Sequence, residues 1–207
     1  MITVETSRSG LPILKEEGRL LASSFDPVKE AETWADHVEP LLGPGAVAII
    51  VGIGAGYHIA ALKARRPSLT VLALDASSEI ADHALKFNPS LTALDVIVES
   101  DRLALTQAPR LHDAMGGHYV PLVHGPTAQQ HPEWCEAVFA FLLGRDKLSF
   151  LLQLRLRPEL FALLEPARIA EIANEPISIK TLQRAFRADA GRNRERRLWR
   201  VLEELVL

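Results

Sequence analysis

The chain has 207 residues, of which 48% are hydrophobic, and its formal net charge is −3. This hydrophobic share is enough for the core of one α/β domain with an appendage, and the small acidic charge excludes a general attraction to nucleic acid or to anionic membranes. The single cysteine, Cys135, excludes an internal disulfide and a multi-cysteine metal site. No apolar run is long enough to span a membrane and no leader pattern is found, so we expect a cytoplasmic protein without membrane contact.

The N-terminal part predicts a β-hairpin followed by a helix. Residues 2–6 favour a strand, and the segments 11–14 and 19–22 flank a glycine-containing turn. Asp26 followed by Pro27 predicts the start of a helix, because Asp accepts hydrogen bonds from the first free amides and Pro tolerates the first helical position.

A glycine turn after a Val/Ile-rich run is the most informative feature of the sequence. Residues 47–51 are typical of a buried parallel strand. Gly52, Gly54 and Gly56 follow, and glycine allows a sharp turn and a close approach of a ligand to the backbone. The helix predicted over residues 57–65 would point its free amides and its positive end at that ligand.

The next strand is predicted over residues 69–74, and Asp75 follows it directly. An acid about 20 residues after the glycines is where a ribose-binding carboxylate usually lies. Tyr57 and His58 occupy the first helical turn, where side chains can reach the ligand. The alternative is that Tyr57 packs against the sheet and that His58 caps the helix or faces solvent. The whole pattern predicts a Rossmann-like, methyltransferase-like α/β fold with a parallel sheet and helices on both faces.

Further strands are predicted over residues 94–98 and 118–123. Residues just beyond strand ends line the ligand crevice of such sheets, so Asp101 or Glu99 could contact a base or ribose. The alternative for Asp101 is a cap for the helix that follows. The predicted ligand contacts are therefore Gly52, Gly54, Gly56, Tyr57, His58, Asp75 and Asp101.

Two histidines after the fourth strand are the best-placed side chains for proton transfer. These are His124 and His131, and the alternative for each is a loop histidine held by ordinary hydrogen bonds. The sequence contains no HxxxH or HExxH motif and no acidic cluster, so we predict no metal site. It also contains no GxSxG or Cys–His motif, so no catalytic residue is assigned.

The chain changes character near residue 132, and we predict a nucleotide-binding domain over 1–131 and a helical region over 132–207. The segment 167–190 resembles a helix-turn-helix, but acids interleave its basic residues. A solvated helical bundle or a homodimer arm is the other interpretation. We therefore expect a small-molecule ligand rather than nucleic acid as the partner.

The glycine spacing is GxGxG, whereas a dinucleotide fingerprint is GxGxxG and would place its third glycine at Tyr57. GxGxG resembles the first motif of S-adenosylmethionine-dependent methyltransferases. Those enzymes commonly carry an acid two residues before the first glycine, where this chain has Ile50.

A composite pattern over residues 8–135 carries a second resemblance. It combines Gly10-Leu11-Pro12, Ser24-Phe25-Asp26-Pro27 with Glu30-Ala31-Glu32, and Val51-Gly52-Ile53-Gly54-Ala55-Gly56-Tyr57-His58. This pattern resembles the N-terminal part of motility accessory factor glycosyltransferase-like proteins, which are related to the hydroxymethylpterin pyrophosphokinase-like family. The resemblance implies a Rossmann-like module that binds a nucleotide or a nucleotide sugar as an accessory to glycan transfer. If the chain is an enzyme, the two resemblances imply a glycosyl or a methyl transferase.

Overall fold

The computed structural model describes residues 1–145, 149–150 and 152. The chain divides into two compact units, residues 1–144 and 145–207, and the description below concerns the first. This unit extends past residue 131, because the helix over Pro132–Leu142 contacts the parallel sheet. The helix-turn-helix-like segment 167–190 and the homodimer arm predicted from the sequence lie outside the described residues.

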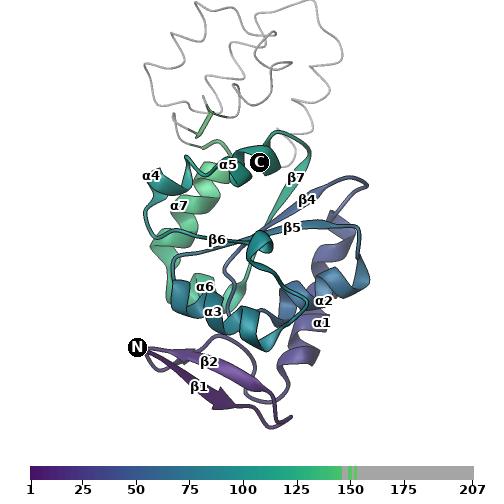
Figure 1. Ribbon diagram of the computed structural model, residues 1–207, viewed down its shortest axis with the longest axis vertical. Coiled ribbons are helices and arrows are strands. Elements are labelled where there is room, and N and C mark those ends of the chain that lie inside the picture. Colours follow the sequence, from purple (N-terminus) through teal and green to yellow (C-terminus); the bar gives the residue numbers. More distant parts are fainter. Residues whose placement is uncertain (146–148, 151, 153–207) are drawn as a thin grey trace, which may run out of the picture. The chain divides into compact units, whose positions relative to one another are not determined.

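The N-terminus forms a three-stranded antiparallel sheet of order β1-β2-β3, whose first two strands are seen in Figure 1. Its strands are β1 (Ile2–Thr6), β2 (Pro12–Glu16) and β3 (Arg19–Leu20). The predicted hairpin is thus confirmed, and Ile13 and Leu14 are buried in the main core. The hairpin is therefore part of the folded core and not a loose extension.

The central sheet has four parallel strands in the order β6-β5-β4-β7. They are β4 (Val47–Val51), β5 (Thr70–Asp75), β6 (Val96–Val98) and β7 (Tyr119–Val123). The middle strand β4 is almost entirely buried, as expected for a parallel strand covered on both faces. The chain progresses from β4 to β6 in one direction and then returns to place β7 on the other side of β4. The sheet therefore has its topological switch point between β4 and β7.

Helices cover both faces of this sheet. They are α1 (Pro27–Val38), α2 (Tyr57–Arg65), α3 (Ser78–Phe87), α4 (Arg102–Leu105), α5 (Pro109–Met115), α6 (Gly125–Gln130) and α7 (Pro132–Leu142). Two short 3-10 turns are η1 (Glu39–Leu41) and η2 (Ala93–Asp95). Helix α1 packs along α2, whereas α7 contacts α4, α6 and β4 (Figure 1). The predicted Rossmann-like α/β architecture is confirmed.

The start of α1 follows directly from its sequence. The Asp26 side chain accepts hydrogen bonds from the amides of Val28 and Lys29, both at 3.1 Å, and Pro27 occupies the first turn. These bonds satisfy two of the amides that a helix leaves free at its N-terminus.

None of the described helices is both long enough and apolar enough to cross a membrane.

Candidate functional site

The glycine turn connects β4 to α2, as predicted. Gly52, Gly54 and Gly56 have φ angles of 97°, 48° and 82°. Residues with a side chain rarely adopt such positive φ angles, so the turn requires glycine at these positions for its backbone shape alone.

The space beside these glycines is filled by the chain itself. A Cβ atom on Gly52 would lie 2.6 Å from the Thr127 side chain, and one on Gly56 would lie 2.7 Å from Nδ2 of Asn88. A Cβ atom on Gly54 would overlap Cε1 of His124. The sequence predicts a ligand at this close approach, whereas the structure places the protein's own side chains there. The reason is that the start of α6 and the end of α3 both pack onto the turn.

Asp75 lies at the end of β5, with only 1% of its surface exposed. Its carboxylate accepts a hydrogen bond from the Ile53 amide at 2.8 Å and another from the Ser77 amide at 3.1 Å. Burial raises the pKa of this carboxyl, while the two bonds act in the opposite direction. The side chain predicted to bind ribose therefore ties the glycine turn to the neighbouring strand.

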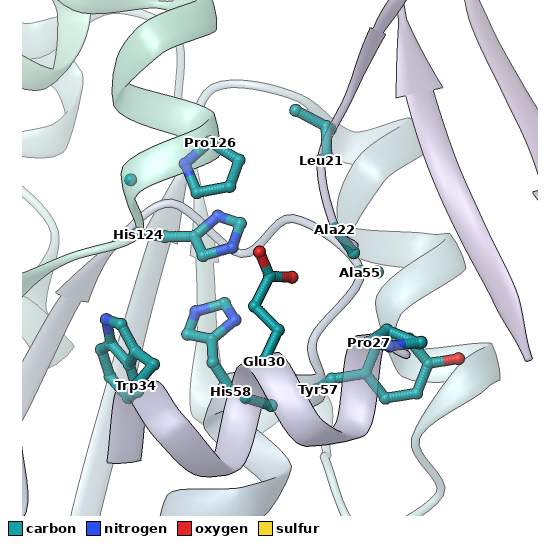
Figure 2. A pocket seen from close by; sticks show the side chains of 12 residues that line it. Leu21, Ala22, Pro27, Glu30, Trp34, Ala55, Tyr57, His58, His124 and Pro126 are labelled. Atoms are coloured by element: carbon teal, nitrogen blue, oxygen red, sulfur yellow. The ribbon is translucent and has the colours of Figure 1, made fainter. Parts of the chain in front are cut away.

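A cavity of about 170 Å³ opens next to the turn, between α1, the first turn of α2 and the start of α6 (Figure 2). Tyr57, His58 and His124 line it, as do Glu30 and Trp34 of α1. Of the predicted ligand contacts, only Tyr57 and His58 lie in its wall. We refer to this cavity as the switch-point pocket, because its wall includes the residues that follow β4 and β7.

Three aromatic rings in contact form one side of the switch-point pocket. The His58 and His124 rings are nearly parallel, 5° apart, with centroids separated by 4.1 Å. Trp34 meets His58 edge to face, with centroids 5.0 Å apart, and its Nε1 donates a hydrogen bond to the Val123 carbonyl at 3.1 Å. These ring contacts join α1, α2 and the end of β7, which fixes the position of the three rings.

Both histidines are buried and neutral near neutral pH. Burial lowers the pKa of His124 to about 4, while burial and the adjacent His124 hold the pKa of His58 well below its ordinary value. His58 Nε2 lies 3.3 Å from the Gly52 carbonyl, which can only accept, so Nε2 carries the proton and Nδ1 is an acceptor. His124 Nδ1 lies 2.8 Å from the Thr127 hydroxyl.

The other predicted residues lie elsewhere. Asp101 is exposed and caps α4 by accepting a hydrogen bond from the Leu103 amide at 2.9 Å, which is the alternative role predicted for it. Glu99 accepts a hydrogen bond from the Asp101 amide. His131 Nε2 lies 2.7 Å from the carboxylate of Glu16 and joins the end of α6 to the hairpin. None of these side chains lines the switch-point pocket.

Helix α1 contributes to the pocket, although no residue of α1 was predicted to bind a ligand. Pro27, Glu30, Ala31 and Trp34 all line the pocket. Their spacing of i, i+3, i+4 and i+7 puts them on one helix face, which is a signal that was present in the sequence. In the part of the chain that the structure describes, no cluster of His, Cys, Asp or Glu side chains is arranged to hold a metal ion.

The parallel sheet of order β6-β5-β4-β7, with a glycine turn after β4, defines a Rossmann-like α/β protein. No protein-family model, curated protein or solved structure matches this chain.

Proposed function

We propose that this chain binds a nucleoside-bearing small molecule in the switch-point pocket. The observation that carries this proposal is the position of the pocket in the sheet. Its wall contains Tyr57 and His58, which follow β4, and His124 and Gly125, which follow β7. Open α/β sheets bind ligands in the crevice where strand order reverses, beyond the carboxyl ends of the strands.

The size of the pocket limits how much of the ligand it encloses. At about 170 Å³ it is smaller than the roughly 300–1,000 Å³ typical of pockets that bury a drug-sized ligand. One ring or one side group fits inside, and the rest of a nucleotide or a nucleotide sugar lies along the surface. A nucleotide sugar is the ligand implied by the motility accessory factor resemblance, with a role accessory to glycan transfer.

One observation favours the alternative, an S-adenosylmethionine-dependent methyltransferase. Several amides of the glycine turn already donate hydrogen bonds within the protein. The Gly52 amide donates to the Leu74 carbonyl, the Ile53 amide to the Asp75 carboxylate, and the Gly56 amide to the Ile53 carbonyl. A phosphate bound at a helix N-terminus depends on such amides being free. A cofactor without phosphates does not need them, so an adenosyl methyl donor suits this turn better than a nucleotide sugar does.

The test is a thermal-unfolding screen of the whole chain with S-adenosylhomocysteine, adenosine, cytidine and uridine nucleotides, and sugar nucleotides at about 1 mM. A ligand at 100 times its Kd stabilises the native state by about 2.7 kcal/mol. Trp34→Phe should reduce the shift because Trp34 forms the pocket wall, whereas Trp134→Phe, outside the pocket, should leave it unchanged. The absence of any shift across the panel would contradict the proposal.

A further inference from the structure

We infer that the switch-point pocket receives a positively charged nitrogen group, such as an ammonium or an amidinium, which donates hydrogen bonds to Glu30 and His58. This inference deepens the proposed function, because it concerns the same pocket and names the part of the ligand that enters it. It rests on the charge, the hydrogen-bonding atoms and the aromatic surface of the pocket wall.

The charge of the wall is negative. Glu30 is the one carboxylate among the residues that line the pocket, and no Lys or Arg is found among them. Figure 2 shows the Glu30 side chain directed toward the space between the histidine rings and Ala22. Glu30 Oε2 accepts a hydrogen bond from the Ser23 amide at 2.7 Å, which holds the carboxylate in place. Its Oε1 has no hydrogen bond to any described residue and is available to a ligand.

The histidine pair adds an acceptor. His58 is 4% exposed, and its Nε2–H donates a hydrogen bond to the Gly52 carbonyl. The other ring nitrogen, Nδ1, therefore carries a free lone pair. In the described residues, every fully buried side-chain nitrogen or oxygen has a hydrogen-bond partner. His58 Nδ1 has no such partner, so it must be accessible, and the pocket is the space that His58 lines. A nitrogen that is otherwise surrounded by protein thus offers an acceptor to a ligand.

These features together select the charge of the ligand group. A phosphate or a carboxylate would meet the Glu30 carboxylate and find no cation to balance it. A cation would donate charge-assisted hydrogen bonds to Glu30 and would be attracted to the aromatic rings that line the pocket. Protonation of His58 would remove the acceptor, but His58 is held neutral by its burial.

Two probes of the same shape and opposite charge test this inference. Benzamidinium and benzoate are titrated separately into the whole chain, and binding is followed by calorimetry and by the NMR signals of Trp34 and the histidines. We expect benzamidinium to bind and benzoate not to bind. Glu30→Gln should weaken benzamidinium binding by about tenfold, because the charged partner of the hydrogen bond is lost. Glu32→Gln removes the same charge from the same helix outside the pocket and should leave the affinity unchanged.

The inference is overturned if benzoate binds as tightly as benzamidinium, or if Glu30→Gln binds benzamidinium as well as the native chain does. Its failure is distinct from that of the proposed function. Nucleoside compounds that stabilise a chain that does not bind benzamidinium would refute the inference alone. Benzamidinium binding that depends on Glu30, with no response to any nucleoside compound, would refute the proposed function alone.

Discussion

The amide of Ile53, in the middle of the glycine turn, donates a hydrogen bond of 2.8 Å to the carboxylate of Asp75 at the end of the adjacent strand. The second carboxylate oxygen accepts from Ser77, so both oxygens hold backbone amides. These hydrogen bonds hold the turn against β5, and Asp75 does not line the pocket. The acid that a sequence pattern assigns to ribose binding therefore has a structural role in this chain.

Replacing this acid should destabilise the fold. Asp75→Asn keeps one carbonyl oxygen but turns an amide donor toward a backbone N–H, so a buried hydrogen bond is lost. We expect the free energy of unfolding to fall by about 1–3 kcal/mol, measured by urea denaturation. Asp113→Asn, an exposed site, serves as the control and should change it by less than about 0.5 kcal/mol. Equal stability of Asp75→Asn and the native chain would show that these bonds do not hold the turn.

The close packing of the glycine turn predicts a difference between two glycine substitutions. Gly54 and Gly45 both have positive φ, but a Cβ atom on Gly45 meets nothing within 4 Å, whereas one on Gly54 overlaps the His124 ring. Gly45→Ala should therefore lower the free energy of unfolding only by the backbone strain, about 1–2 kcal/mol. Gly54→Ala adds the overlap with His124 and should lower it by about 3 kcal/mol or more. Urea denaturation measures both.

A second substitution separates the clash from the strain. If His124 causes the extra cost at Gly54, the cost of Gly54→Ala should become smaller when His124→Ala is already present. An unchanged cost in that background would mean that the ring of His124 is not what restricts this position.

The buried histidines predict a dependence of stability on pH. The pKa of His124 falls from 6.5 to about 4 on folding, and that of His58 is also lowered. Since the unfolded chain binds these protons more readily, stability is fully present above pH 6.5 and is lost as the pH falls toward 4. Between roughly pH 7 and pH 5, His124 alone should account for a loss of about 2 kcal/mol.

Urea denaturation across this pH range measures the loss. His124→Gln should make stability depend less steeply on pH, because one of the two buried imidazoles is gone. His37→Gln, an exposed histidine near the end of α1, should not change the dependence. A native chain whose stability stays constant from pH 7 to pH 5 would contradict the buried, neutral state of both rings.

The contact between Glu16 and His131 should couple the hairpin to the end of α6. The two side chains lie 2.7 Å apart and are 11% and 31% exposed. A double-mutant cycle with Glu16→Gln and His131→Gln should give a coupling energy of about 1 kcal/mol. The exposed pair of Glu5 and Lys15, at 45% and 35% exposure, should give less in the same cycle. A larger coupling for the exposed pair would contradict the greater burial of the first contact.

The elements of the first unit could be predicted from local patterns. The Val/Ile run of residues 47–51, the cap at Asp26 and the positive φ at Gly52 each depend on a few neighbouring residues and on backbone sterics. Such determinants act within a short segment, so they are visible in the sequence. The four strands of the parallel sheet and the hairpin followed from them.

The residues that form the pocket wall could be identified only from the tertiary structure. Trp34, His58 and His124 are far apart in the sequence, and their rings come into contact because α1, α2 and the loop after β7 converge at one end of the sheet. The same convergence fills the space beside the glycines and turns Asp75 toward Ile53. A glycine in the sequence indicates either a positive φ angle or a close approach to the backbone. Whether a ligand or the chain itself makes that approach depends on packing between distant segments, which local residue patterns do not encode.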